Sequence, residues 1–546
     1  MRSTRPMLLA VTAVALAVAI AAVRSVVGPA PARASSTQDA MFEDDAQLLS
    51  NPDGTLMRYR LLGVQVARVR VVWSAIAPHP LAHKPPANFD AADPAAYPQV
   101  NWSVLDRIIG TAQQLGIRVN LDIAGGAPLW ATGPGAPTDK PHPNWDPSPG
   151  AFGAFARAVG ERYSGRYTPA GSSAPLPHVD YWSVWNEPDY GPSLAPQGVA
   201  HHLAIENSPR MYRNLMDAAW RALQGTGHDR DTFIFGELAP RGWNNWGAFS
   251  GMKPLVFLRA LYCVDRSYSE LRGGAAAARG CPTTAGGSSR FRAAHPALFR
   301  ATGFSVHPYM RWYTPNREAQ PDRDYSSLGE LGGLERALDR LQRVYGSSRR
   351  LPIYDTEFGY ITSPPKHPTK RSPWVSQATA AYYLNWAEYI SWRDPRVQSF
   401  NQYLLYDPVP ALASNDYGGF ASGLLNHNGA QKATYAAWRL PLYLPVTSTR
   451  RGHSLEVWGC ARPAYFATTD PGAGAQSVQI QFQAGSRGPF ATLETVPIPN
   501  RHGYFDTHVV VPSSGMVRLT WTYPPLDPLL APGHPTYSRQ VQVTLR

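Results

Sequence analysis

The sequence predicts an α/β protein, a closed (β/α)₈ barrel followed by a small all-β sandwich. Three observations lead to this expectation. Strand-like and helix-like segments alternate between about residues 40 and 405, two of the strands end in a glutamate, and short strands with turn residues between them dominate after about residue 445. The chain has 546 residues, 44% of them apolar and 16% charged, which is enough for a large core and excludes global disorder.

Short apolar runs that are typical of buried parallel strands recur eight times. They lie at about residues 40–42, 63–73, 117–123, 179–185, 232–236, 303–309, 351–356 and 397–405. Helices are predicted between them at about 102–115, 150–163, 208–224, 252–264, 328–345 and 376–391. Such alternation indicates a parallel sheet, and eight units indicate a closed barrel. An open doubly wound sheet is the alternative, but no Gly-rich phosphate loop follows the first strand.

The pattern changes after about residue 445. Segments such as 477–482, 508–511 and 516–521 are short strands separated by Gly, Pro, Ser and Asn turns. We therefore expect residues 35–445 to form the barrel domain and residues 446–546 to form a β-sandwich domain.

The N-terminus predicts export. Arg2 and Arg5 precede an apolar stretch over residues 7–23, and the Ala-Arg-Ala sequence at 32–34 offers a cleavage site. We expect residues 1–34 to be a signal peptide and the mature protein to be secreted. An anchor that stays uncleaved is the alternative, because the stretch is long enough to span a bilayer. No later segment reaches transmembrane length.

The three cysteines allow one disulfide. Cys263 and Cys281 flank a Gly/Ala-rich stretch and are close in sequence, so we expect them to pair and Cys460 to be a buried thiol. The stretch 269–290 predicts a mobile barrel insertion. No spacing resembles a metal site. The net charge of +12 is scattered, without a run of five Lys or Arg, so we expect no nucleic-acid partner.

Two predicted strands end in a glutamate. Residues 181–188 end in Asn-Glu-Pro, with Glu187 at the centre of that triplet, and Glu357 follows the run at 351–356. Because the C-terminal ends of barrel strands meet on one face, the fold would bring these two acids together. Two carboxylates about 5 Å apart cleave glycosidic bonds with retention, whereas a wider gap admits water and gives inversion.

Asn186-Glu187-Pro188 on a fourth strand, with a second glutamate on a seventh, resembles the clan A glycoside hydrolases, retaining barrel enzymes that include families 5 and 39. The resemblance covers about residues 40–445. It implies that Glu187 is the acid/base and Glu357 the nucleophile, and that Asn186 hydrogen-bonds the sugar 2-hydroxyl.

The resemblance also implies roles for other side chains. Arg68 resembles the family arginine beside the nucleophile, and Arg70 competes for that role because strand alternation points both the same way. His307 and Tyr309 match a family site that contacts the nucleophile or the sugar. The chain departs from the family at the eighth strand, where many relatives have a Trp platform and this one has Gln402, Tyr403 and Tyr406.

Further candidates come from strand ends and loops. Trp130 is expected to stack on sugar, and Glu237, which ends the fifth strand, is a rival carboxylate that we expect to contact substrate. Asp122 and Asp355 lie inside their strands and are expected to brace neighbouring loops.

Together these features predict a monomeric, secreted β-glycoside hydrolase that acts on an oligo- or polysaccharide without a metal or organic cofactor. A transglycosylase that remodels a cell-envelope glycan with the same residues is the first alternative. A non-catalytic glycan-binding barrel is the second, and the glutamate pair argues against it because a binder needs no two unmatched buried acids.

Overall fold

The computed structural model describes residues 34–546 except 200–201, 245–246, 319–320, 363–373, 410–419, 469–473, 499 and 525–532. All but the last residue of the predicted signal peptide therefore lie outside the described residues. Within the described part, no helix is both long enough and apolar enough to cross a membrane.

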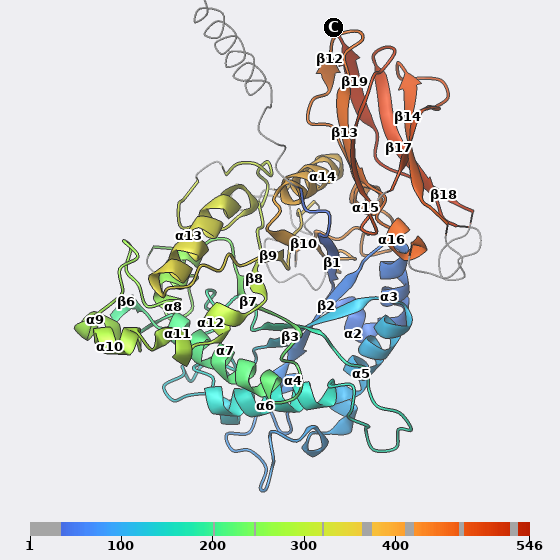
Figure 1. Ribbon diagram of the computed structural model, residues 1–546. Helices are drawn as coiled ribbons and strands as arrows, with labels where there is room; N and C mark the ends of the chain where they lie inside the picture. The colour runs from blue at the N-terminus through green and yellow to red at the C-terminus, as the bar shows by residue number, and fades with distance from the viewer. Residues whose placement is uncertain are drawn as a thin grey trace, which may run out of the picture.

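Eight parallel strands close a barrel, as predicted (Figure 1). The first strand pairs with both the second and the last, so the sheet has no edge. The strands are β1 (Asp39–Glu43), β2 (Val66–Val72), β3 (Arg118–Ala124), β4 (Tyr181–Val184), β7 (Thr232–Leu238), β8 (Gly303–Val306), β9 (Ile353–Asp355) and β10 (Val397–Tyr403).

The six helices expected between the strands are present. They are α5 (Gln99–Gln114), α6 (Pro149–Arg162), α7 (Ser208–Gln224), α8 (Pro254–Leu261), α13 (Leu331–Val344) and α14 (Gln377–Arg393). Shorter elements fill the connections: α4 (Trp73–Ile76), α15 (Ala433–Arg439), the turns η1 (Pro94–Ala96), η2 (Leu129–Ala131) and η3 (Leu328–Glu330), and the ribbon of β5 (Gly198–Val199) and β6 (His202–Glu206).

The sequence did not predict the helices between β1 and β2, which are α2 (Asp45–Ser50) and α3 (Pro52–Leu61). Their apolar residues do not gather on one helical face, so periodicity gave no signal. The capping residues did carry one. Asp44 accepts from the amide of Gln47 at 3.1 Å, and Asn51 accepts from the amide of Gly54 at 3.2 Å just before Pro52.

The predicted disulfide between Cys263 and Cys281 is confirmed. The stretch that it encloses, together with the residues that follow, forms four short helices: α9 (Gly273–Ala277), α10 (Ala285–Ser288), α11 (Phe291–Ala294) and α12 (Ala297–Arg300). The third cysteine, Cys460, is a buried free thiol, also as predicted.

The interior of the barrel is apolar at one end and charged at the other. Met41, Val66, Tyr181, Ile234 and Tyr354 form a separate buried cluster from five strands. Because side chains alternate along a strand, the next inward positions toward the C-terminal ends are two residues further on. These positions include Glu43 and Arg68, which are fully buried.

The C-terminal region forms two sheets that pack face to face. The first consists of β11 (Leu442–Tyr443), β13 (Leu455–Cys460) and β16 (Tyr504–Val509), and the second of β12 (Ser448–Thr449), β19 (Val541–Leu545), β17 (Gly515–Thr522), β14 (Ser477–Ala484) and β15 (Ala491–Pro497), with β18 (Pro535–Tyr537) beside β17. A Cβ on Gly459 of the first sheet would meet Leu519 of the second at 2.8 Å, so the two sheets are in close contact. β11 lies just before the boundary expected at residue 446.

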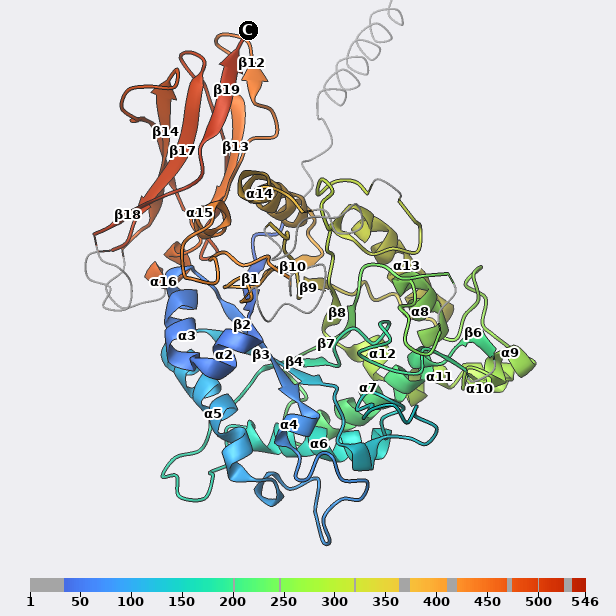
Figure 2. The ribbon, with the colours of Figure 1, turned by 180° about the vertical axis from the view of Figure 1, so that it is seen from behind.

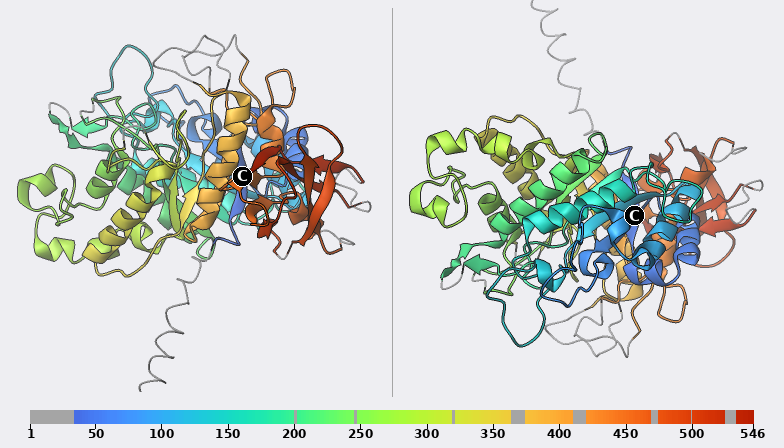
Figure 3. Two further views of the ribbon diagram at one scale, coloured as in Figure 1. Left: turned by 90° about the horizontal axis from the view of Figure 1, so that it is seen from above. Right: turned by 90° about the horizontal axis from the view of Figure 1, so that it is seen from below.

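These sheets stand against one side of the barrel, beside α3, α14 and the short helix α16 (Ala464–Ala467) (Figures 1 and 2). The views from above and below place them at the same side (Figure 3). A buried ion pair joins the two parts: Arg462 lies 2.6 Å from Oε1 and 2.7 Å from Oε2 of Glu388 in α14. Tyr504 of β16 donates to the same carboxylate at 2.9 Å.

We predict that Arg462→Met lowers the free energy of unfolding by about 3–5 kcal/mol, because it leaves the Glu388 carboxylate buried without its counterion. The midpoint of urea unfolding measures the effect. Arg107→Met is the matched control, since Arg107 pairs with Asp53 at the exposed surface and its loss should leave the midpoint unchanged. Equal midpoints for the two variants would contradict the prediction.

Candidate active site

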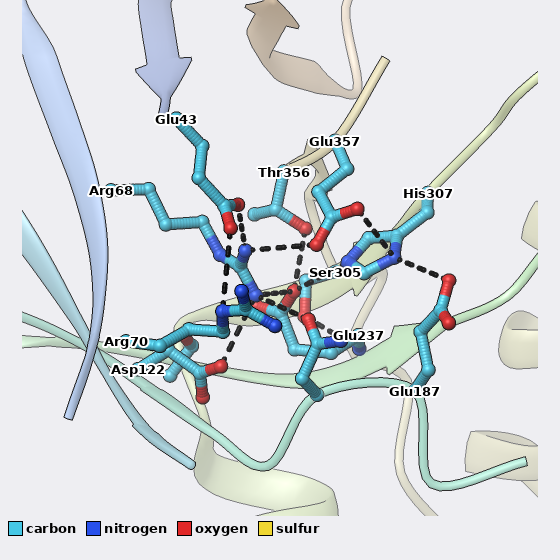
Figure 4. Close-up of polar contacts among 12 residues, drawn as sticks. Glu43, Arg68, Arg70, Asp122, Glu187, Glu237, Ser305, His307, Thr356 and Glu357 are labelled. Atoms are coloured by element: carbon cyan, nitrogen blue, oxygen red, sulfur yellow. Dashed lines mark hydrogen bonds and ion pairs between the residues drawn. The ribbon is translucent and has the colours of Figure 1, made fainter. Parts of the chain in front are cut away.

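The charged end of the barrel brings together residues from seven strands or the turns that directly follow them (Figure 4). The members are Glu43 on β1, Arg68 on β2, Asp122 on β3, Glu187 after β4, Glu237 on β7, His307 after β8 and Glu357 after β9. All lie toward the C-terminal ends of the strands, the face on which barrel enzymes place their chemistry.

The fold brings Glu187 and Glu357 together. One carboxylate oxygen of each lies within 4.8 Å of the other, and both surround Nδ1 of His307. That nitrogen is 3.0 Å from Glu187 Oε1 and 3.6 Å from Glu357 Oε2. The side chain of Glu187 is 21% exposed and that of Glu357 is 9% exposed, so both acids reach the surface of the site.

The backbone at two of the acids is in the left-handed region. Glu187 has φ +47° and Glu237 has φ +48°. A residue with a side chain enters this region at a cost of about 1–3 kcal/mol, and such residues gather at functional sites. The amide of Glu187 donates to the carbonyl of Glu237 at 2.9 Å, so a hydrogen bond between neighbouring strand ends holds this turn in place.

Arg68 is the centre of the cluster. Its guanidinium is fully buried and contacts four carboxylates: Glu43, Asp122 at 3.2 Å, Glu237 at 3.0 Å and Glu357 at 3.0 Å. It also donates to Oδ1 of Asn186 at 3.0 Å. The structure thereby decides between the two arginine candidates, because Arg70 is one-third exposed and binds Asp45 at 2.6 Å.

One guanidinium cannot balance four ionised carboxylates, and the protonation states differ accordingly. Burial raises the pKa of Glu43 well above its usual value and that of Asp122 to about 7, although Arg68 opposes the rise in both. Burial also acts to raise the pKa of Glu237. There the charge of Arg68 and the hydrogen bond from His307 outweigh burial, and the pKa falls to about 2.

His307 bridges three acids from a fully buried position. Its Nδ1 faces Glu187, and its Nε2 lies 2.9 Å from Oε2 of Glu237. An ionised carboxylate can only accept, so the nitrogen of His307 that faces Glu237 carries a proton. Burial lowers the pKa of His307, but the surrounding charges of Glu357, Glu187 and Glu237 outweigh it and raise the pKa well above its usual value.

Tyr309 and Asn186 lie beside Glu357 and Arg68, and the predicted contact of Asn186 with a sugar hydroxyl stays a prediction. The hydroxyl of Tyr309 donates to Glu357 Oε2 at 3.0 Å, so each oxygen of this carboxylate has one donor, Tyr309 on one side and Arg68 on the other. Asn186 adjoins a small cavity of about 100 Å³ that Arg70, Asn144 and Trp185 also line.

Two residues that the sequence predicts to contact substrate, Glu237 and Trp130, are in contact with other side chains of the protein. Glu237 has no solvent exposure and accepts from Arg68, His307 and the Thr356 hydroxyl, the last at 2.8 Å. We therefore assign it to holding these partners, in place of the substrate contact that we expected. Trp130 packs against Trp73 and Phe89 at ring distances of 6.0 and 5.8 Å, so its sugar-stacking role stays a prediction.

The sequence did not predict Glu43 as a member of the cluster, and it predicted a different role for Asp122. Glu43 is the last residue of β1, and Glu187 and Glu357 lie just after the ends of their strands. This position at a strand end was the signal that the sequence offered for Glu43. Asp122 was expected to brace a loop, but it binds Arg68 of the neighbouring strand β2. Arg68 is in register with Asn120, and Asp122, two residues further along β3, faces the same side as Asn120. Asp355 accepts from the amide of Asn401 on β10 at 3.4 Å, and also from the backbone amide of Glu357 just after β9.

The spacing of Glu187, His307 and Glu357 would also suit a metal ion. In this site, however, Arg68 and His307 already supply positive charge to Glu357. The expectation that no cofactor is required stays a prediction.

No protein-family model matches the sequence, and no curated protein matches it. Among solved structures, the fold is similar to a family 1 β-glucosidase of Thermotoga maritima, with 14% identity over 71% of this chain and 85% of that chain and a TM-score of 0.44. It is also similar to GH5_18 of Streptomyces cattleya, with 14% identity over 74% and 79% and a TM-score of 0.44. A glucosidase of Croceicoccus marinus has 12% identity over 88% and 95% and a TM-score of 0.46.

We predict that Glu237→Gln destabilises the protein in a pH-dependent way. The pKa of Glu237 is lowered on folding, so its charge contributes on the order of 3 kcal/mol above pH 4.5, and this contribution is lost as the pH falls toward 2. The gap in thermal unfolding midpoint between wild type and variant should be largest near pH 7 and should shrink below pH 4.5.

Glu161→Gln, on helix α6 outside the site, is the control and should follow the wild-type curve. A gap for Glu237→Gln that stays constant down to pH 3, or that widens, would show that its charge is not stabilised by Arg68 and His307.

Proposed function

We propose that this chain is a retaining glycoside hydrolase in which Glu187 is the acid/base and Glu357 the nucleophile. The observation that carries the proposal is the pair of carboxylate oxygens within 4.8 Å of each other at the C-terminal end of the barrel. A retaining mechanism requires carboxyl groups about 5 Å apart, whereas inverting enzymes leave roughly 6.5–9.5 Å for a water molecule between them. The observed separation favours direct attack by a carboxylate.

The surroundings of the two glutamates support these roles. Glu357 receives the Arg68 guanidinium on Oε1 and the Tyr309 hydroxyl on Oε2, both at 3.0 Å. Two donors of this kind fix the orientation of a carboxylate that attacks as a nucleophile. Glu187 is more exposed and has no arginine contact among the described residues, which suits a group that must carry a proton and exchange it.

The reaction then proceeds in two displacements. Glu357 attacks the anomeric carbon and forms a glycosyl ester, while the bond to the leaving oxygen breaks and Glu187 gives its proton to that oxygen. In the second step Glu187 takes a proton from water, and the oxygen of that water replaces Glu357 on the anomeric carbon. Both steps invert the anomeric carbon, so the product keeps the starting configuration.

His307 fits both steps. When Glu357 becomes an ester it loses its negative charge, and at the same moment Glu187 becomes ionised. The Nδ1–H of His307 lies near both acids, at 3.0 Å from one and 3.6 Å from the other, so it can follow the negative charge as that charge moves. Glu237 holds the opposite nitrogen and keeps the ring in place.

The proposal extends to export and to a carbohydrate substrate. The N-terminal apolar stretch supports secretion, and the carboxylate pair supports cleavage of a β-glycosidic bond in an oligo- or polysaccharide. A screen of aryl β-glycosides and polysaccharides with the secreted protein identifies the sugar. Product analysis with an added acceptor sugar separates hydrolysis from transglycosylation by the same residues.

We predict that Glu187→Ala lowers kcat by roughly 10²–10⁴-fold on glycosides with poor leaving groups. The loss should be much smaller on dinitrophenyl glycosides, whose leaving group needs no proton. Azide should restore turnover and yield a β-glycosyl azide, since it can enter the space of the missing carboxylate. Glu357→Ala should be inactive on both substrates.

Glu494→Gln, on strand β15 of the C-terminal sheets, is the control and should keep wild-type rates. A first product of inverted configuration by NMR, or unchanged rates in both barrel variants, would refute the mechanism.

We also predict that Tyr309→Phe slows formation of the glycosyl-enzyme about tenfold to hundredfold. A hydrogen bond to a charged group contributes about 1.5–3 kcal/mol, and this one orients the attacking carboxylate. Pre-steady-state kinetics with a dinitrophenyl glycoside measure this step. Tyr360→Phe is the matched control, because the Tyr360 hydroxyl donates to the carbonyl of Tyr313 and not to an acid. Equal rates for the two variants would contradict the role of Tyr309.

A further inference from the structure

A second cluster of titratable side chains lies at the opposite end of the barrel. His178 precedes β4, while His228 and Asp231 precede β7, so the three belong to the N-terminal ends of neighbouring strands. One ligand atom of each lies within 4.8 Å of the other two. Glu187 and Glu357 follow the C-terminal ends of their strands, so this cluster takes no part in their chemistry.

Backbone carbonyls fix the tautomer of both imidazoles. His178 Nδ1 lies 3.1 Å from the carbonyl of Ser164, and His228 Nε2 lies 2.9 Å from the carbonyl of Gly160 in α6. A carbonyl can only accept, so each of these nitrogens carries the proton. In a neutral imidazole the other nitrogen then presents a lone pair.

Both lone pairs point at the same carboxylate. His178 Nε2 is 3.1 Å from Asp231 Oδ1, and His228 Nδ1 is 2.6 Å from Oδ2. An ionised carboxylate also offers only lone pairs, so the three groups repel one another unless a cation lies among them. Added protons could supply that charge, and so could one divalent ion.

We propose that His178, His228 and Asp231 bind a divalent transition-metal ion of the zinc type. Two imidazoles and one carboxylate are a preferred ligand set for such ions, while calcium and magnesium favour oxygen ligands throughout. The side chain of His178 is 39% exposed, which leaves a fourth position open to a water molecule.

The supporting contacts match those of protein metal sites. Metal-binding histidines donate their second N–H to a carbonyl or carboxylate, as both imidazoles do here. The indole N–H of Trp182 donates to Asp231 Oδ2 at 3.3 Å and holds the carboxylate in place. His228 is fully buried, and its ring stacks on that of His178 at 4.9 Å.

The ion has a structural role. It joins the long connection between α6 and β4, which carries His178, to the short connection between α7 and β7, which carries the other two ligands. Because metal binding favours the folded chain over the unfolded chain, it raises the stability of the barrel.

The test is zinc binding by the full-length secreted protein after treatment with a chelator and desalting. Isothermal titration with zinc chloride in a non-chelating buffer at neutral pH should show about one ion per chain. Thermal unfolding should shift upward by a few degrees with excess zinc and should not respond to magnesium. Addition of cobalt(II) should give the visible absorption of a four-coordinate ion.

Three variants complete the design. His178→Ala and Asp231→Asn should bind zinc at least tenfold more weakly and lose both the thermal shift and the cobalt spectrum. His142→Ala is the matched control, since His142 pairs with Asp139 at 2.9 Å without a second imidazole, and it should bind as wild type does. His178→Ala removes a partly exposed side chain, so its unfolding midpoint without zinc checks that it folds.

No zinc binding by wild type up to about 1 mM would show that protons alone fill the cluster and would overturn the proposal. Binding that His178→Ala and Asp231→Asn retain would place the ion elsewhere and would overturn it as well.

Discussion

The barrel depends on one buried cation. Arg68 lies on β2 with no solvent exposure, and moving an arginine into such a place costs several kcal/mol unless its charge is met. Here carboxylates from β1, β3 and β7 meet it, together with Glu357 after β9. Each strand that supplies an acid is held against the guanidinium. The contacts that compensate the buried charge of Arg68 therefore also set the relative positions of the strand ends.

The carboxyl groups around Arg68 differ in how far their negative charge is stabilised. Glu237 keeps its negative charge because it has both Arg68 and His307, whereas burial favours the neutral form of Glu43 and Asp122. The site therefore has a graded set of carboxyl groups around one arginine. Those deepest in the barrel support the arginine and the histidine, and those at the rim, Glu187 and Glu357, remain available to a substrate.

Much of this arrangement followed from the sequence. The eight strands were visible because buried parallel strands are continuous apolar runs, and Glu187 and Glu357 were visible because each follows such a run. The choice between Arg68 and Arg70 could not be made, because both side chains point inward and only their height in the barrel differs. In the structure Arg68 lies 3.0 Å from Glu357, whereas Arg70 binds Asp45, and this difference decides between them.

Other features were beyond a single sequence. Glu237 resembles the two rim acids in its position at a strand end, and only its burial beneath His307 reveals a different role. The cluster of His178, His228 and Asp231 joins separate connections, and neither ring tautomer can be known before the carbonyls of Ser164 and Gly160 are placed. Helices α2 and α3 have no apolar face that periodicity could detect, so only their capping residues indicated them in the sequence.

The closure of the barrel has a consequence for how the chain is made. β1 begins only a few residues after the predicted signal peptide, yet it pairs with β10, and the side chain of Gln38 just before it binds Tyr504 of β16 at 3.1 Å. Under the export that we propose, a chain that crosses the membrane N-terminus first keeps β1 without its partner β10 until most of its length has crossed. On the same proposal the fold is completed outside the cell, where the oxidising conditions that favour the Cys263–Cys281 bond are also found.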